Sequence, residues 1–187
     1  GLVINNLCFQ YEKNGRSILR NIALQCKPRK IIAIVGQNGS GKSTLVKLLA
    51  GLYQANTGSI SFDNVELKDV SEDVYRKHAV FLFQDFEKYF FTIEENIILG
   101  RPDISQSITD VETAAQLSGA AQFISRLSKG YETRMGRVFE GSEQLSGGEW
   151  QKLALSRVFY RKHASMIVLD EPTSALDASA EHEIFQQ

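Results

Sequence analysis

The sequence predicts an α/β protein with a mostly parallel central sheet. Two apolar runs of strand length, residues 31–35 and 166–169, each end in a polar segment that can bind a ligand. The first run leads into GQNGSGKST at residues 36–44, which fits the pattern G-x-x-x-x-G-K-[ST] at every fixed position, and a helical pattern follows. The second run ends in Asp170 and Glu171. Open α/β sheets bind their ligands at the carboxyl ends of strands, so these observations predict a P-loop NTPase core.

Composition and charge limit the classes of partner. The 187 residues suffice for one well-buried domain, and 21 Lys and Arg against 22 Asp and Glu give a net charge of -1. We therefore expect no nucleic-acid partner. Cys8 and Cys26 lack metal or redox spacing and are predicted to be buried thiols in a reducing compartment. No apolar run approaches the roughly twenty residues of a membrane span, so we expect a soluble polypeptide.

The first half of the chain alternates strand and helix patterns. Two alternating segments flank the turn signal at residues 12–15 and predict an antiparallel hairpin on one flank of the core. Gly51 is expected to end the helix after the loop, and Ser71 is expected to cap the next helix. The expected strands are residues 2–9, 18–25, 30–35, 58–63 and 79–83, and the expected helices begin near residue 42 and at residue 71.

The second half becomes helical before it returns to strand. Helical segments without strands suggest a small subdomain inserted into the α/β core. We expect one domain over residues 1–187, with a RecA-like core and β flank formed by residues 1–84 and 160–187, and a helical subdomain at 85–159. The expected helices are 93–98, 109–118, 119–127, 147–160 and one capped by Ser179, with a loop at 130–144 and a buried strand at 165–169.

The phosphate loop predicts a nucleoside triphosphate site that uses Mg²⁺. Glycines let successive backbone N–H groups point at phosphate oxygens, and the helix start adds its free N–H groups and positive dipole end. Lys42 is expected to reach the β and γ phosphates, Ser43 to ligate Mg²⁺, and Thr44 to support the α phosphate. A glycine-rich turn without a ligand is the alternative. The predicted nucleotide contacts are Gly36, Asn38, Gly39, Ser40, Gly41, Lys42, Ser43 and Thr44.

The carboxylates after the second apolar run complete the predicted chemistry. A carboxylate near a phosphate loop can hold Mg²⁺ directly or through water, and we assign this role to Asp170. Glu171 is then expected to orient or deprotonate the attacking water. The alternative is an acidic pair on the surface at a strand end.

The segment Leu145-Ser146-Gly147-Gly148-Glu149, followed by Trp150-Gln151-Lys152, resembles the signature loop of ABC ATPases. It lies between the phosphate loop and the Asp-Glu strand, in the order of that family. The resemblance implies ATP as the nucleotide and a head-to-tail pair of such domains, identical or different. Ser146, Gly147 and Gly148 would then contact the γ phosphate held by Lys42 of the other domain. Capping of the helix at Gly147 by Ser146 is a compatible alternative.

Three further positions match the family in turn. Gln84 resembles the Q-loop glutamine that senses Mg²⁺ and the attacking water, so it joins Lys42 and Glu171 as a predicted catalytic residue; alone it would be a solvated strand end. Tyr11 matches the aromatic residue that stacks on adenine, although packing is the commoner role of such a residue. Residues 174–177 resemble the D-loop, in which Asp177 would link the two protomers.

The loop after Gln84 suggests an exporter. Residues 85–91 contain four aromatic side chains, which either form a partner surface or fold inward. In the family this loop borders the groove for a transmembrane domain, fused or separate, so we expect docking near Gln84–Phe91 at the cytoplasmic face of a membrane. Residues 92–97 and 136–144 resemble exporter ATPases. A soluble nucleotide-gated clamp and a regulatory module that does not hydrolyse ATP are the alternatives.

Two departures from the family pattern qualify this resemblance. Glu149 stands where the family most often has glutamine, which changes the local charge. The family's last buried strand and its γ-phosphate histidine are not found, because His78, His163 and His182 lie elsewhere in the motif order. The sequence therefore resembles a fragment, for which we expect Mg-ATP binding with slow hydrolysis.

Overall fold

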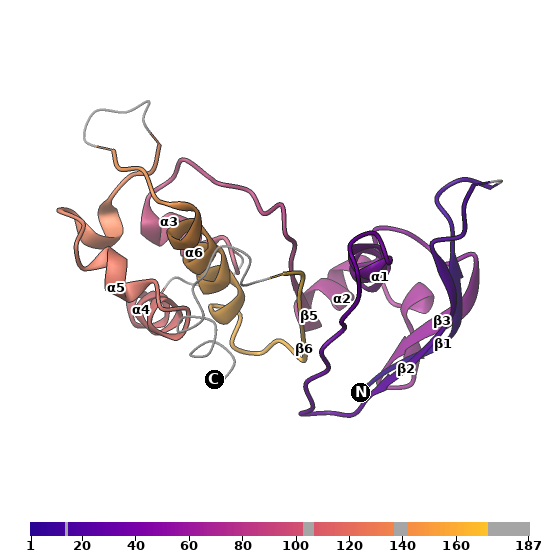
Figure 1. Ribbon diagram of the computed structural model, residues 1–187. Coiled ribbons are helices and arrows are strands. Elements are labelled where there is room, and N and C mark those ends of the chain that lie inside the picture. Colours follow the sequence, from indigo (N-terminus) through magenta and orange to yellow (C-terminus); the bar gives the residue numbers. More distant parts are fainter. Residues whose placement is uncertain (14, 103–106, 137–141, 172–187) are drawn as a thin grey trace. The chain divides into compact units, whose positions relative to one another are not determined.

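The structure is a computed structural model that describes residues 1–13, 15–102, 107–136 and 142–171. The chain divides into two compact units, residues 1–79 and 80–187, and each is described by itself. The predicted D-loop at residues 174–177 and the helix expected after Ser179 lie outside the described residues. Figure 1 shows the elements of each unit.

A four-stranded antiparallel sheet organises the first unit. Its order is β2-β1-β3-β4, with β1 at Leu2–Phe9, β2 at Leu19–Cys26, β3 at Thr57–Phe62 and β4 at Val65–Glu66. Ile4 pairs with Leu24 on one side and with Ile60 on the other. Ile4, Leu7 and Phe9 are buried, as the alternating pattern of β1 requires. The predicted hairpin and the strand predicted at residues 58–63 are confirmed.

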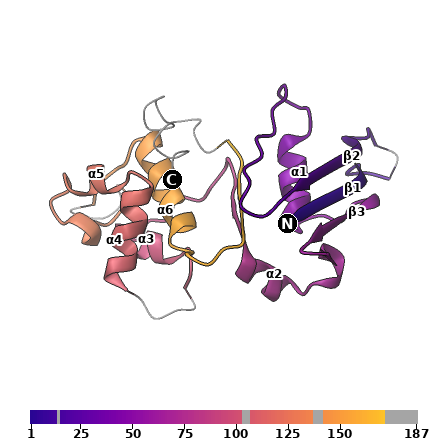
Figure 2. The same cartoon turned by 90° about the horizontal axis from the view of Figure 1, so that it is seen from below.

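Helices α1 (Lys42–Leu49) and α2 (Glu72–His78) lie on one side of this sheet, and the short 3₁₀ helix η1 covers Leu67–Asp69 (Figures 1 and 2). The Tyr75 hydroxyl donates to the Leu49 carbonyl at 2.7 Å and ties α2 to α1. Burial raises the pKa of Tyr75 above its usual range. Ser71 is the N-cap of α2, but its side chain accepts no capping hydrogen bond, so that part of the prediction is wrong. The first turn of α2 instead carries Glu72 and Asp73, whose negative charges interact favourably with the positive end of the helix dipole.

The predicted stop at Gly51 is confirmed as a Schellman motif. Gly51 has a φ of 73°, and its N–H donates to the Leu48 carbonyl at 3.1 Å. The Leu52 N–H donates to the Lys47 carbonyl at 3.0 Å. These two bonds satisfy carbonyls that the end of α1 would otherwise leave unpaired. A Cβ at Gly51 would meet nothing within 4 Å, so backbone conformation alone explains the glycine.

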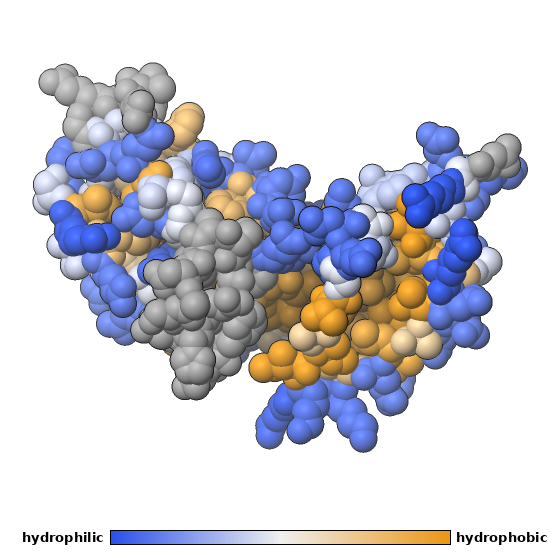
Figure 3. Space-filling model, viewed as in Figure 1, coloured by the Kyte–Doolittle hydropathy of each residue, from blue (hydrophilic) through white to orange (hydrophobic). Residues whose placement is uncertain are grey.

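The expected buried strand at residues 30–35 is not formed. The segment is irregular, and Ile31 and Val35 are 85% and 89% exposed. Figure 3 shows a hydrophobic area over the segment that leads from β2 to α1. An apolar sequence makes a strand only where a neighbouring backbone pairs with it, and in the described part of the chain no strand is hydrogen-bonded to this segment. The segment is apolar, as predicted, but the prediction assumed a neighbouring strand to pair with it.

A two-stranded sheet and a group of helices form the second unit. β5 (Ala79–Leu82) lies beside β6 (Met166–Leu169), and the Asp170 N–H donates to the Leu82 carbonyl at 2.8 Å. The last residues of both strands therefore meet at the same edge, as in a parallel pair. Both strands were predicted. The burial expected for the second is wrong, because β6 has only β5 beside it among the described strands and Ile167 is 47% exposed.

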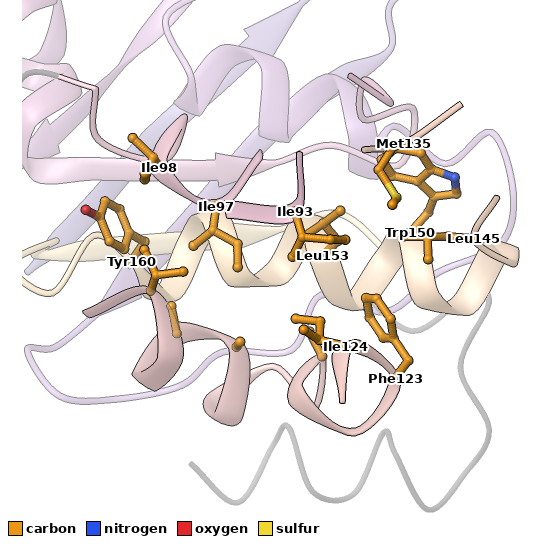
Figure 4. Close-up of a cluster of buried hydrophobic side chains, with 14 residues drawn as sticks. Ile93, Ile97, Ile98, Phe123, Ile124, Met135, Leu145, Trp150, Leu153 and Tyr160 are labelled. Atoms are coloured by element: carbon orange, nitrogen blue, oxygen red, sulfur yellow. The ribbon is translucent and has the colours of Figure 1, made fainter. Parts of the chain in front are cut away.

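Helix α6 (Gly147–Phe159) is the centre of the second unit (Figure 4). One face packs into a cluster with residues of α3 (Ile93–Ile98), α4 (Ile108–Leu117) and α5 (Ala121–Ile124), where Ile93, Ile97 and Leu153 are fully buried. The other face places Leu155 and Val158 against Val80 and Leu82 of β5. The helices predicted at 93–98, 109–118 and 147–160 are confirmed. The helix predicted at 119–127 is confirmed but shorter, because tight turns follow α5. The 3₁₀ helix η2 (Gly130–Glu132) lies within the expected loop.

Gly100 allows the chain after α3 to lie directly on α6. A Cβ at Gly100 would lie 2.1 Å from the carbonyl oxygen of Arg157 and 2.9 Å from its carbonyl carbon. No side chain fits at that distance, since the obstacle is backbone. The end of α3 and the last turn of α6 are therefore in close contact.

Candidate functional site

The phosphate loop ends in a helix start that is suited to an anion. Gly41 is the N-cap of α1 with a φ of 99°, a left-handed conformation that favours glycine. The N–H groups of Lys42, Ser43 and Thr44 lie in the first turn, where a helix offers them no acceptor. The first turn carries no acidic residue. Free donors and a positive dipole end, with no carboxylate in the first turn, fit a phosphate group.

The Lys42 ammonium points back into the loop. Its Nζ donates to the Gly36 carbonyl at 2.7 Å and to the Gln37 carbonyl at 3.1 Å. The Ser40 N–H donates to the Gln37 carbonyl at 3.1 Å, and a Cβ at Gly36 would lie 2.8 Å from the Ser40 Oγ. The loop is thus a tight turn around a cation, and residues 36–40 are exposed. This donor set and this cradle fit the phosphates of a nucleotide.

Tyr11 lies next to this loop within the first unit. Its hydroxyl is 3.2 Å from the Thr44 Oγ1, so the residue expected at the base and the residue expected at the α phosphate are in contact. The rings of Phe9 and Tyr53 meet Tyr11 nearly at right angles, with centroids 4.9 Å and 5.1 Å away. Tyr11 is still 49% exposed, which leaves ring surface for a base. Tyr53 was not predicted as a neighbour, and its position after Gly51 carries no signal for one.

The predicted site residues of the second unit, Gln84, Asp170 and Glu171, lie just beyond the ends of its two strands. Asp170 follows β6 and is buried, whereas Gln84 lies two residues beyond β5 and is exposed. Since the two strands end at the same edge, the structure brings these two segments together. Glu171 has a φ of 50°, a conformation uncommon outside glycine and often found at functional sites. Its carbonyl accepts from the Gln151 Nε2 at 3.1 Å, a contact that sequence reasoning missed.

A capping box opens the helix that carries the signature segment. The Ser146 Oγ accepts from the Glu149 N–H at 3.3 Å, and the Glu149 Oε2 accepts from the Ser146 N–H at 2.9 Å. The same carboxylate oxygen accepts from the Ser146 hydroxyl at 2.9 Å. Ser146 therefore caps α6, and Ser146 and Gly147 remain exposed. The capping interpretation is confirmed; it does not exclude an anion.

The unusual Glu149 has a cationic neighbour. The Arg126 Nη2 lies 3.1 Å from the Glu149 Oε1, while the other oxygen holds Ser146. Arg126 is 72% exposed, so water and salt weaken the attraction. A carboxylate in the first turn of a helix is attracted by the positive end of the helix dipole, but it repels a bound phosphate.

Arg157 anchors the loop after Gln84 to α6. Its guanidinium donates to the Glu87 carbonyl at 2.8 Å, to the Asn96 carbonyl at 3.2 Å and to the Asn96 Oδ1 at 2.6 Å. It also lies 4.9 Å from the centre of the Tyr89 ring. Burial lowers the pKa of Arg157 to about 10, so the group stays charged near neutral pH. Sequence reasoning missed this network.

The fully buried Asn96 holds the same loop from the other side. Its Nδ2 donates to the Tyr89 carbonyl at 3.0 Å and to the Thr92 carbonyl at 2.9 Å. Of the four aromatic side chains, Phe86 packs against the buried clusters. The remaining three are exposed, and the Tyr89 and Phe91 rings stack with centroids 5.8 Å apart. The inward alternative therefore holds for Phe86 alone, and the exposed side chains are Tyr89, Phe90 and Phe91.

The loop, its helix and the antiparallel flank define a P-loop nucleotide-binding protein. The chain belongs to the ABC transporter family, whose model matches residues 19–174. It is similar to the ATP-binding domains of exporters, and the α/β fold predicted from the sequence is confirmed.

Curated relatives match nearly the whole chain. The nisin transport ATP-binding protein of Lactococcus lactis subsp. lactis is 43% identical over 96% of this chain and 30% of its own length. The subtilin transport ATP-binding protein of Bacillus subtilis is 40% identical over 98% of this chain and 30% of its own length. The chain thus spans about a third of the length of these relatives.

A solved structure agrees with the fold. The structure of a bacterial Atm1-family ABC exporter with ATP bound matches 99% of this chain and 31% of its own, with 33% identity and a TM-score of 0.89. Among the described residues, no helix has the length and apolar character needed to cross a bilayer.

Proposed function

We propose that this chain binds Mg-ATP at residues 36–44 and hydrolyses it to drive export through a transmembrane domain. The observation that carries the proposal is the α1 start, where the Lys42 ammonium lies over the loop and the first turn contains no acidic residue. Membership of the ABC transporter family and the names of the transport relatives support the reaction and the process.

Each site residue has a proposed role. Lys42 and the loop N–H groups bind the β and γ phosphates, and Tyr11 stacks on adenine. Ser43, Gln84 and Asp170 are the residues that would hold Mg²⁺. When bound, Mg²⁺ neutralises charge on the phosphate oxygens. Glu171, assisted by Gln84, orients the attacking water and accepts its proton.

The partners are proposed on the same basis. A second ABC ATPase domain would offer its Ser146, Gly147 and Gly148 to the γ phosphate, and the exposed Ser146 and Gly147 support this. The transmembrane domain would dock near Gln84–Phe91, and the three exposed aromatic side chains there support this. The chain would then lie at the cytoplasmic face of a membrane. The division into a core of residues 1–84 and 160–187 and a helical part at 85–159 stays a prediction.

Nucleotide binding and hydrolysis can be tested on single variants. We expect Lys42→Ala to lose most Mg-ATP affinity, because the only loop cation of the site is removed, and Glu171→Gln to bind Mg-ATP but not hydrolyse it. Lys47→Ala is the matched control, since Lys47 lies in the last turn of the same helix. Calorimetry gives the affinity and phosphate release gives the rate. Equal affinity of Lys42→Ala and Lys47→Ala for Mg-ATP would contradict the proposed site.

A further inference from the structure

The hydroxyl of Tyr11 has a contact that the stacking of a base does not require. Stacking uses the face of an aromatic ring, and a phenylalanine ring would serve as well. The Tyr11 hydroxyl instead lies 3.2 Å from the Thr44 Oγ1, in the first turn of α1. Thr44 is buried, so few water molecules can take the place of Tyr11. The two residues are 33 positions apart, and the packing of the unit brings them together.

The protons of this pair have one arrangement that is compatible with a bound phosphate. Phosphate oxygens accept hydrogen bonds, so Thr44 must use its single hydroxyl proton to bind one. The Thr44 oxygen can then only accept from Tyr11, which has a proton of its own to donate. The resulting chain runs from Tyr11 through Thr44 to the phosphate. Each bond in such a chain polarises the next.

The ring of Tyr11 is held in place for this contact. Phe9 and Tyr53 meet it nearly at right angles, with interplanar angles of 82° and 85°. The hydroxyl end is thereby kept on Thr44 while half of the residue stays exposed. Base and phosphate recognition therefore share one side chain.

We propose that Tyr11 is a positioning residue for phosphate, in addition to any contact of its ring with the base. Its hydroxyl fixes the rotamer of the Thr44 hydroxyl and directs the Thr44 proton toward the phosphate. The inference rests on the proposed nucleotide site and adds a second function to one of its residues. It predicts that Tyr11 affects the binding of phosphates that carry no base.

Affinities for two ligands test this on the 187-residue chain. Calorimetry measures binding of Mg-ATP and of Mg-tripolyphosphate, which has no base, to wild type, Tyr11→Phe, Thr44→Val and the double variant. We expect Tyr11→Phe to weaken both ligands by the same factor, about threefold to tenfold, which is the usual effect of one hydrogen bond. In the Thr44→Val background the same change should have no effect. Tyr53→Phe, which keeps the ring that packs against Tyr11 and removes only a neighbouring hydroxyl, should bind like wild type.

The outcomes separate this inference from the proposed function. If Tyr11→Phe leaves tripolyphosphate affinity unchanged, or tightens it, the hydroxyl does not position Thr44 and the inference fails. Equal losses in the wild-type and Thr44→Val backgrounds also overturn it. The double-mutant cycle of Tyr11→Phe and Thr44→Val is measured with each ligand. If the chain binds Mg-ATP but not tripolyphosphate, the cycle with Mg-ATP still decides whether the Tyr11 hydroxyl acts through Thr44. If the wild-type chain binds neither ligand, the proposed nucleotide site is itself refuted, and the inference with it.

Discussion

Replacing Arg157 with methionine should destabilise the second unit strongly, although Arg157 forms no ion pair among the described residues. Methionine keeps much of the apolar stem but donates no hydrogen bond. Two of the three acceptors that would lose their donor are oxygens of Asn96, which is 0% exposed. The third, the Glu87 carbonyl, lies in an exposed residue and can turn to water.

The size of the effect follows from those two buried oxygens. Each buried acceptor left without a donor costs about 1–3 kcal/mol, so Asn96 alone predicts a loss of about 2–6 kcal/mol. Part of this loss in stability is offset, because the variant no longer has to desolvate a charged guanidinium on folding. We therefore expect a loss of about 3 kcal/mol in the free energy of unfolding. Arg157→Lys should lose less, because an ammonium can still reach one acceptor.

Urea unfolding followed by the fluorescence of Trp150, the only tryptophan, measures this loss in the helix concerned. Arg126→Met is the matched control, because its ion pair is exposed and should contribute less than about 1 kcal/mol. A double-mutant cycle of Arg157→Met with Asn96→Ala measures the coupling free energy between the two side chains. If Arg157→Met costs no more than Arg126→Met, or if the cycle shows no coupling, the guanidinium does not support the loop.

Three further predictions concern single side chains. A raised pKa in the folded state means that Tyr75 stabilises the fold below about pH 10 and loses this effect as pH rises further, so wild type should lose more stability than Tyr75→Phe in alkaline urea titrations. The Thr133 Oγ1 is buried without a hydrogen-bond partner among the described residues, so Thr133→Val should raise the thermal midpoint by an amount equivalent to about 1 kcal/mol; a lower midpoint would contradict this. Glu149→Gln keeps an acceptor for the Ser146 N–H but removes the charge, so the fold should lose less than about 1 kcal/mol from the helix dipole and the exposed Arg126 pair. Dimerisation with Mg-ATP, measured by light scattering in the Glu171→Gln background, should tighten, and weaker dimerisation would show that the carboxylate helps.

Features set by neighbouring residues were predictable from the sequence. The alternation in β1 and β2 identified the hairpin, Gly51 marked the end of α1, and Ser146 was expected at a helix N-terminus. Each signal lies within a few residues of its structural effect. The phosphate loop is predictable for the same reason, because its glycines, its lysine and the helix start are consecutive.

Features that depend on distant partners were not predictable. Residues 30–35 have the composition of a buried strand, yet composition does not supply the neighbouring backbone that a strand needs. The Arg157 and Asn96 side chains meet across 61 positions, and neither position has a local pattern that indicates the other. The Tyr11 contact with Thr44 spans 33 positions, so only the family resemblance placed Tyr11 at the site.

Gly51 and Gly100 should tolerate different replacements in a library that samples all twenty amino acids at each position and is selected for folded protein. At Gly51 the requirement is a φ of 73° in open space, which asparagine and aspartate also adopt, so these two residues should survive selection for folded protein at reduced frequency. At Gly100 the requirement is the absence of a side chain against the Arg157 carbonyl. Alanine, the smallest possible change, should therefore be as depleted there as tryptophan.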